Sequence, residues 1–323
     1  MATLQLPDLP EVRAARDRIR EHVHRTPLLS SRSLGEAHGA RLHLKAENLQ
    51  RGGAFKIRGA LNAVLKARER GDIGPEGVIT YSSGNHGQAV ALAAQIVGVP
   101  GTVFVPEDIA AVKRAAIEEY GARVVPCGLT SVDRQKGAEE LAGRTGAFIV
   151  PPYDHPDIIA GQGTTALEIV EDLPDVEAIL VPVGGGGLIS GIAIAAKALK
   201  PGVRIIGVEP ETANDMALSL AAGRKVSIPP SRTIADGLRA LTPGDLTFEA
   251  ARRCVDEIWC VDDESIVTAQ ERLLERTKLF VEPSGAAAVA AFLVHGERLR
   301  TRTVAVVLSG GNADVPHLGG QTR

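Results

Sequence analysis

The sequence predicts an α/β fold in which short strands alternate with helices. Apolar runs rich in β-branched residues recur along the chain, and a helix-forming stretch lies next to each of them. These runs are continuously apolar instead of alternating, as expected for parallel strands covered on both faces. At 323 residues the chain exceeds the usual size of a single core, so we expect two domains built from βαβ units.

The expected elements follow one another without a long linker or an internal repeat. Strands are expected at 78–83 (VITYSS), 101–107 (GTVFVPE), 123–127 (RVVPC), 147–152 (AFIVPP), 178–183 (AILVPV), 203–210 (VRIIGVEP) and 303–311 (TVAVVLSGG). Helices are expected at 56–70 (KIRGALNAVLKARER), 84–98 (GNHGQAVALAAQIVG) and 110–121 (AAVKRAAIEEYG). The last of these ends at Gly121, as a helix C-terminus commonly does.

Composition excludes several classes of protein. A net charge of −3 argues against a nucleic-acid or membrane-surface partner, which would need a basic face. No apolar run is long enough to span a bilayer, and the N-terminus has no apolar signal core. Cys127, Cys254 and Cys260 show no CxxC spacing, so they form no recognisable disulfide or zinc framework and suit a reducing compartment. We therefore expect a cytoplasmic protein.

The stretch VPVGGGGLISG (181–191) runs from an expected strand through four glycines into an expected helix. Such a loop brings backbone N–H groups close to an anion, and the next helix directs its positive end at it. No Gly-Lys-Ser/Thr follows, so the loop is not a Walker A motif. It also fits the dinucleotide fingerprint poorly. A single phosphate is the favoured guest, and a tight turn without a ligand is the alternative.

Two further polar turns follow expected strands. SSGNHGQA (82–89) offers hydroxyls, an amide, an imidazole and free N–H groups at a helix N-terminus, which would suit a substrate carboxylate. The alternative is simple N-capping by Ser83 or Asn85. SGGN (309–312) ends another strand. Ligands of open α/β sheets lie beyond the carboxyl ends of the strands, so these turns are expected to converge on one crevice.

Lys56 follows two glycines in GGAFKIRGA (52–60) and stands at the start of an expected helix. Taken alone, it could be an ordinary solvated cation. Together with a phosphate loop and a carboxylate site, it points to pyridoxal phosphate (PLP), which bonds a lysine as an imine and supplies an electron sink.

The chain resembles the fold type II PLP enzymes, and most closely the serine racemase and threonine (serine) dehydratase family. GAFKIRGALNA, SSGNHGQA, AGQGT, VPVGGGGLISGIA, TIADGL and LSGGN match in order and spacing from about Thr26 to Asn312. The resemblance implies a tryptophan synthase β-like fold: two open, twisted, mostly parallel sheet domains with the cofactor in the cleft between them. Residues 1–76 and 151–323 would form the large PLP-binding domain, and 77–150 the small mobile domain.

The resemblance also implies roles for individual residues. Lys56 would be the imine lysine, Phe55 would pack behind the cofactor ring, and Asn85 would bond the ring hydroxyl. Ser309 would face the pyridine nitrogen. The phosphate would be cradled by Gly184, Gly185, Gly186, Gly187 and Leu188, and the substrate carboxylate would be held by Ser82, Ser83, Asn85 and His86.

The implied activity is that of an L-threonine/L-serine dehydratase (ammonia-lyase), which forms 2-oxobutanoate or pyruvate plus ammonia by β-elimination. The implied partners are a small hydroxy amino acid and, as a homodimer, a second copy of the chain. Serine racemase as the main activity and 3-hydroxyaspartate dehydratase are the alternatives. A β-replacement synthase would typically show a TSGNTG-like loop, which SSGNHGQA does not match. A protein that binds PLP without turnover remains a third class.

Two finer expectations come from the same resemblance. Glu209, the Ala213 carbonyl and Asp215, in VEPETANDM (208–216), would bind Mg²⁺, or Ca²⁺ or Mn²⁺, through hard oxygen ligands. The alternative is two solvated carboxylates near a helix start. Ser83 would face the substrate α-carbon opposite Lys56 and act as the second acid–base group in racemisation. Its alternative role is to cap the following helix.

Overall fold

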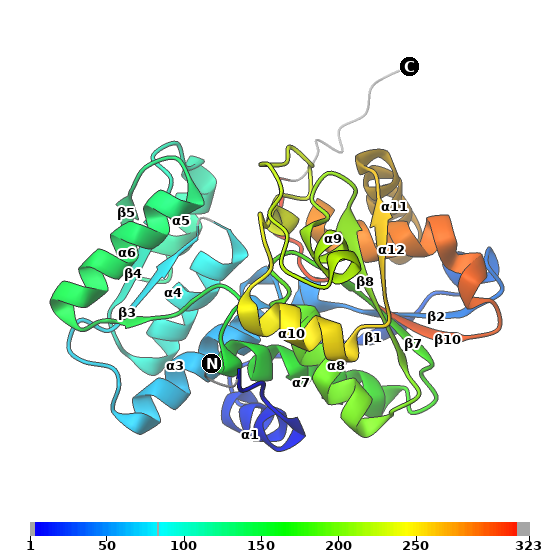
Figure 1. Cartoon of the computed structure of the whole chain (residues 1–323), viewed down its shortest axis with the longest axis horizontal. Helices are drawn as coiled ribbons and strands as arrows, with labels where there is room; N and C mark the ends of the chain where they lie inside the picture. Colours follow the sequence, from blue (N-terminus) through cyan, green and yellow to red (C-terminus); the bar gives the residue numbers. More distant parts are fainter. Residues whose placement is uncertain (1–3, 83, 315–323) are drawn as a thin grey trace.

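The computed structural model describes residues 4–82 and 84–314, which form two sheets with helices packed on them. The larger sheet has six strands in the order β1-β2-β10-β7-β8-β9, and the smaller has four in the order β5-β4-β3-β6. Every pairing is parallel except that of β1 with β2. The predicted α/β fold with two mostly parallel sheets is confirmed. Figure 1 shows the two sheets as separate halves of the molecule.

The bounds of the elements are as follows. The strands are β1 (Leu28–Ser30), β2 (Arg41–Lys45), β3 (Val78–Tyr81), β4 (Gly101–Val105), β5 (Arg123–Pro126), β6 (Phe148–Ile149), β7 (Ala178–Pro182), β8 (Arg204–Pro210), β9 (Glu257–Val261) and β10 (Thr303–Val307). The α-helices are α1 (Leu9–Ile19), α2 (Arg32–Glu36), α3 (Lys56–Arg70), α4 (Asn85–Val97), α5 (Ala111–Glu118), α6 (Ser131–Thr145), α7 (Pro156–Asp172), α8 (Gly187–Leu199), α9 (Asp215–Ala222), α10 (Asp245–Cys254), α11 (Asp263–Thr277) and α12 (Pro283–His295).

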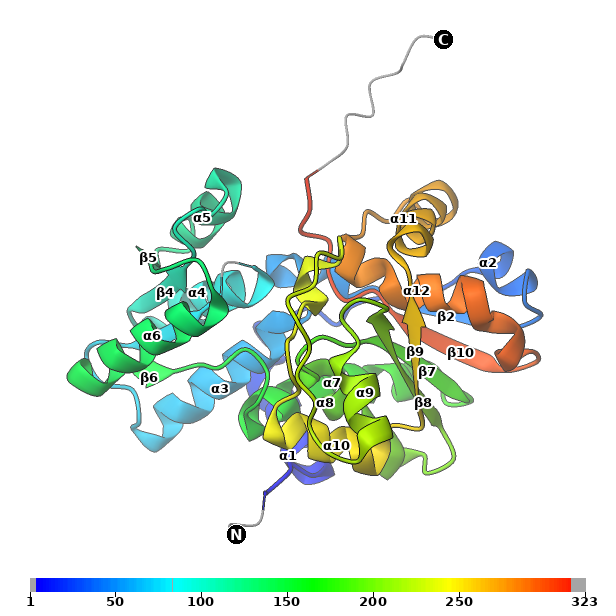
Figure 2. The ribbon, with the colours of Figure 1, turned by 45° about the horizontal axis from the view of Figure 1, so that its top comes forward.

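The large sheet is covered on both faces, which explains its continuously apolar strands. Ile179 and Val181 of β7 pack with α1, α7 and α8, whereas Ala178 and Leu180 of the same strand pack with α11 and α12. Figure 2 shows these two helical layers on opposite sides of the strands. Both helical layers pack apolar side chains against the sheet and cover its two faces. Only the ends of the strands therefore remain available to a ligand.

The small sheet lies wholly between residues 78 and 149. α4 and α5 pack on one of its faces and α6 on the other, where Ile79 and Phe104 meet Ala138. The chain enters this unit after α3 and leaves it after β6, so both connections are single crossings. Domain limits at residues 77 and 150 stay a prediction. Within the described residues, none of the helices combines the length and apolarity that crossing a bilayer requires.

Three strands of the large sheet were missed by the sequence analysis. β1 has only three residues. β2 reads RLHLK, and its two basic ends look like a solvated segment, although Lys45 is fully buried. β9 is an edge strand that pairs only with β8. The predicted strands were those with uninterrupted apolar runs, because only they carry a clear signal of burial on both faces.

Candidate active site

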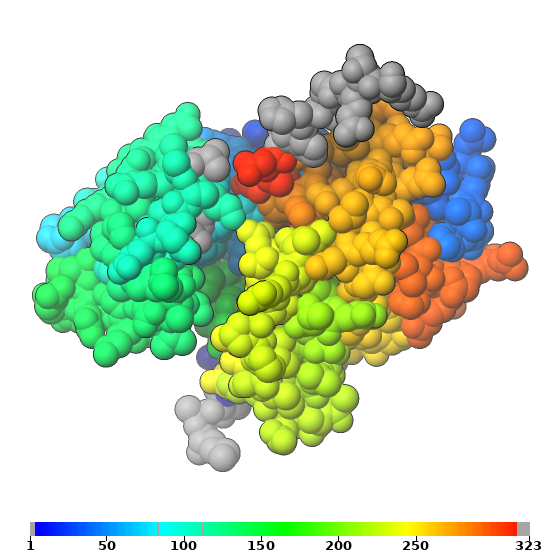
Figure 3. Space-filling view, turned by 90° about the horizontal axis from the view of Figure 1, so that it is seen from above, coloured from blue at the N-terminus to red at the C-terminus, as the bar shows by residue number. Residues whose placement is uncertain are grey.

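A cavity of about 380 Å³ lies between the two sheets, at the carboxyl ends of β3, β7 and β10. This size falls within the range of small-molecule sites. Figure 3 shows the hollow between the half that carries α4–α6 and the half that carries the large sheet. The predicted residues Phe55, Lys56, Ser82, Asn85, His86, Gly184, Gly185, Gly186, Gly187, Leu188 and Ser309 all line it. The three polar turns therefore meet in one place.

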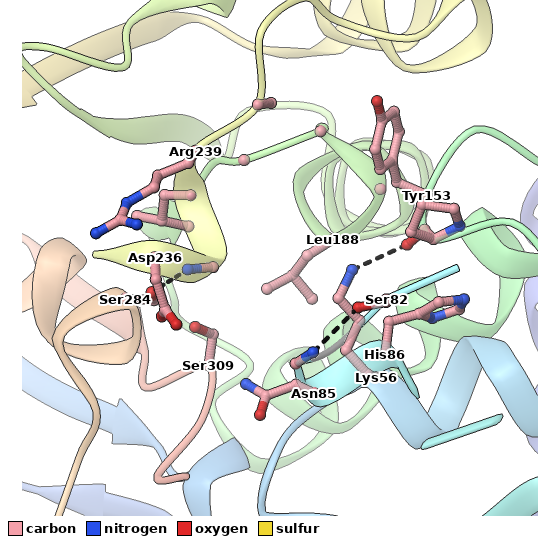
Figure 4. Close-up of a pocket in the computed structure, with 18 of the residues that line it drawn as sticks. Lys56, Ser82, Asn85, His86, Tyr153, Leu188, Asp236, Arg239, Ser284 and Ser309 are labelled. Carbon is pink, nitrogen blue, oxygen red and sulfur yellow. Dashed lines mark hydrogen bonds between the residues drawn. The ribbon is translucent and has the colours of Figure 1, made fainter. Parts of the chain in front are cut away.

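Lys56 is the first residue of α3, and its side chain points into the cavity (Figure 4). Gly52 and Gly53 both have positive φ angles, 72° and 71°, which lets the chain turn sharply just before the helix. The Lys56 Nζ donates to the Pro152 carbonyl at 2.9 Å and lies 5.2 Å from the Phe55 ring centroid. Burial lowers the pKa of Lys56 to about 8, and the Glu282 carboxylate opposes this only in part.

This lowered pKa gives a testable pH dependence. We expect the cofactor-free protein to capture pyridoxal phosphate at a rate that rises with pH and is half-maximal near pH 8, because the unprotonated Lys56 amine is the reacting form and burial sets its pKa at about 8. Stopped-flow absorbance from pH 6 to 10 would measure it. A lysine with the ordinary pKa of about 10.4 would instead give a rate that still climbs at pH 10, which would contradict the assignment.

The glycine loop joins β7 to α8 and is shaped by close contacts. A Cβ atom at Gly185 would lie 2.2 Å from the Tyr153 ring, and Gly186 has a φ angle of 89°. Neither position therefore accepts a side chain. The backbone N–H groups of residues 184–188 donate to no other described group. Together with the positive end of α8, they form an anion site of the kind that binds phosphate.

A second anion site is formed by the start of α4. The N-cap residue is Gly84, which has no side chain to cap the helix, so the alternative of capping by Asn85 is not realised. The Ser82 hydroxyl accepts a hydrogen bond from the Gly84 N–H at 3.3 Å. Ser83, assigned to catalysis and carboxylate binding, lies outside the described residues. The helix terminus favours a bound carboxylate.

His86 is held in one protonation state. Its Nε2 lies 3.0 Å from the Val150 carbonyl oxygen, and its Nδ1 has no partner among the described residues. Burial, together with the charge of Lys56, lowers the pKa of His86 to about 3, so the ring is neutral. A carbonyl accepts only, so Nε2 carries the hydrogen and Nδ1 is an acceptor. The ring therefore has no donor left for a carboxylate, and only the backbone N–H of His86 can bind one.

Several lining residues were missed by the sequence analysis. Tyr153 packs against the glycine loop, and Ser284 accepts a hydrogen bond from the Gly237 N–H at 2.9 Å. Glu282 accepts a hydrogen bond from the Asn85 amide at 2.7 Å, and burial raises its pKa to about 7. Arg134 also lines the cavity; it was not assigned to the site because an isolated arginine in a sequence is more often solvated. The signal for Glu282 was a Glu-Pro pair before an Ala-rich helix, which resembles an ordinary helix start.

The three residues assigned to a metal lie on β8, at the first residue of α9 and in the turn that joins these two elements. Glu209, at the end of β8, accepts hydrogen bonds from the Met216 and Ala217 N–H groups at 3.0 and 2.8 Å. Asp215 is fully buried, and neither of its carboxylate oxygens has a partner among the described residues. Burial raises the pKa of Glu209 to about 8 and that of Asp215 to about 7. Within residues 4–82 and 84–314, no group of three or more His, Cys, Asp or Glu side chains forms a metal site.

These observations fit the cofactor that the sequence indicated. The cavity offers the Lys56 amine, whose pKa is lowered, and the Ser309 hydroxyl after β10. It also offers the glycine loop, in which neighbouring atoms occupy the space that side chains would need, so that only backbone faces the phosphate. In Figure 4, Leu188 points into the space between these groups. A phosphate group, an aldehyde carbon and a ring nitrogen each find a complementary partner on the cavity wall.

Comparison with known proteins gives consistent matches over nearly the whole chain. Residues 19–310 match the family described as "Pyridoxal-phosphate dependent enzyme". The chain is 45% identical to the L-threo-3-hydroxyaspartate ammonia-lyase of Saccharomyces cerevisiae, over 96% of this chain and 94% of the relative. It resembles the solved structure of T.th. threonine deaminase with a TM-score of 0.90 at 46% identity, covering 96% and 100% of the two chains. Maize serine racemase gives a TM-score of 0.93 at 40% identity, covering 96% and 95%.

Proposed function

Because the chain belongs to the pyridoxal-phosphate dependent enzyme family, we propose that it is an L-threonine/L-serine dehydratase (ammonia-lyase) with serine racemase as a second activity. The resemblance that the motifs carried is confirmed by relatives named for these activities. The proposed reaction is β-elimination from a hydroxy amino acid to a 2-oxo acid plus ammonia.

The single observation that carries the proposal is the meeting of Lys56 with two anion sites in one cavity. The N-terminus of α8 suits the cofactor phosphate, and the N-terminus of α4 suits the substrate carboxylate. An amino acid held by its carboxylate at α4 would present its α-carbon to the Lys56 side of the cavity. This supports chemistry at the α-proton.

The chain's own residues then take these roles. PLP, when bound, supplies an electron sink for the charge left at the α-carbon. Lys56, whose burial brings its pKa to about 8, is suited to take the α-proton as a general base near neutral pH. The glycine loop holds the phosphate, and Asn85 and Ser309 orient the ring. Ser309 is a neutral hydroxyl, so it does not hold a ring nitrogen protonated as a carboxylate would, which favours elimination over transamination.

A 2-oxo acid assay tests the proposal directly. The PLP-loaded protein should release 2-oxobutanoate from L-threonine and pyruvate from L-serine, which a lactate dehydrogenase-coupled loss of NADH absorbance detects. L-Alanine, which has no β-leaving group, is the matched control substrate and should give no product. If neither hydroxy amino acid yields a 2-oxo acid, the proposed dehydratase activity is wrong.

One observation favours 3-hydroxyaspartate as an alternative substrate. Arg134 lines the cavity, and its Nη1 donates to the Leu129 carbonyl at 3.3 Å. The guanidinium would pair with a second carboxylate on the substrate, because the two groups match in charge and geometry. In that case L-threo-3-hydroxyaspartate should have the highest kcat/KM, and Arg134→Gln should lower it for this substrate while sparing L-threonine.

Ser83 is proposed to set the share of racemisation. Racemisation needs proton transfer on both faces of the α-carbon, and the family resemblance assigns Ser83 to the face opposite Lys56. We expect Ser83→Ala to lower L- to D-serine conversion about a hundred-fold, the usual contribution of one acid–base group, while elimination from L-threonine is retained. Chiral chromatography beside the 2-oxo acid assay measures both. Wild-type protein that forms no D-serine would refute the racemase activity alone.

We also propose a divalent cation at Glu209, the Ala213 carbonyl and Asp215. The two unpartnered oxygens of the buried Asp215 support it, because a buried carboxylate without a partner is costly. Removing Mg²⁺ with EDTA should lower Tm by a few degrees, since a cation at a hundred times its Kd contributes about 2.7 kcal/mol. Asp215→Asn should abolish this response, whereas Glu211→Gln, an exposed change in the same loop, should preserve it. If neither EDTA nor Mg²⁺ changes the Tm, the metal assignment is wrong.

The remaining parts of the proposal concern assembly and location. A homodimer is proposed from the family resemblance, and sedimentation velocity at micromolar concentration would measure it. A cytoplasmic location is supported by three cysteines that all remain free thiols. Residues 77–150 are proposed to close over the substrate as a small mobile domain.

A further inference from the structure

Glu282 is a buried carboxylate in the wall of the cavity, and neither the sequence motifs nor the roles above account for it. It is 5% exposed and is the N-cap residue of α12. Its Oε1 accepts from the Asn85 Nδ2 at 2.7 Å, and its Oε2 accepts from the Asn312 backbone N–H at 3.1 Å. It therefore joins α4, the turn after β10 and α12 at the side of the cavity where Asn85 lies.

The hydrogen bonds around Glu282 have a fixed direction because the series of bonds begins and ends at backbone groups. The Asn312 Nδ2 donates to the Gly52 carbonyl at 2.7 Å, and a carbonyl only accepts. The Asn312 backbone N–H only donates, so it requires an acceptor in Glu282. The Asn312 Nδ2 also donates to the Asn85 Oδ1 at 2.9 Å. This leaves the Asn85 nitrogen facing the Glu282 carboxylate.

The direction of these bonds decides what Asn85 offers to a ligand. Its oxygen accepts from Asn312, and one of its two amide hydrogens goes to Glu282. The second amide hydrogen is left for the cavity, which Asn85 lines. Figure 4 shows the Asn85 side chain on the same side of the cavity as Ser309. If the amide were reversed, it would present an oxygen to the ligand instead.

We propose that Glu282 and Asn312 are positioning residues that fix the Asn85 amide so that it donates, and does not accept, a hydrogen bond at the cofactor's ring oxygen. This rests on the proposed function, in which Asn85 binds the ring hydroxyl. A fixed donor stabilises negative charge on that oxygen without the cost of reorienting when the charge forms. Glu282 thus acts on the ring oxygen through Asn85.

Glu282→Gln tests the proposal because it preserves shape and changes only the direction of donation. The side-chain oxygen of the substituted glutamine must still accept the hydrogen bond from the Asn312 N–H. Its NH₂ group would then face the NH₂ group of Asn85, and neither can accept. Reversing Asn85 relieves that conflict but brings its NH₂ group against the Asn312 Nδ2. One hydrogen bond is lost in either arrangement, and the donor to the ring oxygen is no longer fixed.

The measurements are the Kd of PLP, from equilibrium dialysis, and the visible absorption spectrum of the loaded protein. At pH 8, above the pKa of about 7 that burial gives Glu282, Glu282→Gln should weaken PLP binding about tenfold and shift the absorption maximum. Glu297→Gln, the same change at an exposed site just after α12, should match wild type in both. An unchanged Kd and spectrum in Glu282→Gln would overturn the proposal.

A double-variant comparison separates action through Asn85 from a general loss of structure. In an Asn85→Ala background, Glu282→Gln should change the Kd less than about twofold, because the group through which it acts is gone. A full tenfold effect in that background would show that Glu282 acts elsewhere and would overturn the proposal. If instead wild-type protein binds PLP but makes no 2-oxo acid, the proposed dehydratase function fails while the positioning role of Glu282 is still decided by these Kd values.

Discussion

Lys56→Ala should abolish turnover and the absorbance band that arises when Lys56 bonds the cofactor as an imine. Lys56 is the only lysine whose pKa the cavity lowers, among the described residues with a resolved shift, and burial brings it to about 8. It is proposed both to bond the cofactor and to move the α-proton. General-base catalysis alone contributes about 10² to 10⁴-fold, so the loss in kcat should be at least about a thousand-fold.

Two further variants distinguish loss of the reactive amine from loss of the cofactor site. Lys56→Arg keeps a positive charge but provides no reactive amine, and it should be as inactive as Lys56→Ala. Lys136→Ala, an exposed lysine on α6, should retain wild-type activity. The glycine loop is intact in all three variants, so non-covalent PLP binding by dialysis should persist. Turnover by Lys56→Ala within tenfold of wild type would sink the assignment.

Most of the cavity could be predicted from the sequence because its residues lie in turns with a recognisable purpose. The glycines at 184–187 have no use in a helix or strand, and the structure explains them by the Tyr153 ring and the positive φ angle of Gly186. Lys56 gained meaning only beside that loop. Glu282 and Tyr153 carried no such pattern, since their importance comes from neighbours that are distant in sequence.

The fold could be predicted where burial leaves a simple periodic signal. β7 and β10 are apolar throughout, so the sequence identified them. β2 was missed because Lys45 at its end looks like a solvated residue, whereas it is fully buried. Its ammonium donates to Glu168 at 2.5 Å and to the Thr26 carbonyl at 2.7 Å. A single sequence cannot reveal that a charge is paired with one 123 positions away.

Arg58→Met should destabilise the protein by about 3 to 5 kcal/mol, the cost of breaking a buried ion pair. Arg58 lies on α3 two residues after Lys56 and is 1% exposed. It donates to both carboxylate oxygens of Glu47, at 2.8 and 2.9 Å, and of Glu168, at 2.7 and 2.9 Å. Although burial alone would raise it, the charge of Arg58 holds the pKa of Glu47 below its usual value. Without Arg58, the carboxylates of Glu47 and Glu168 would remain buried with the single positive charge of Lys45 beside them.

At about 2.1 cal/mol/K per residue, that loss should lower Tm by roughly 4 to 7 °C, which calorimetry measures. Arg16→Met, at an exposed ion pair with Glu171, is the matched control and should cost at most about 1 kcal/mol. Adding Glu47→Gln to Arg58→Met should recover part of the loss, because it removes one uncompensated charge. A Tm within about 2 °C of wild type for Arg58→Met would contradict this prediction, because it would show that the carboxylates are protonated or hydrated at little cost in free energy. The expected loss would mean that these buried charges stabilise the start of α3, which carries Lys56.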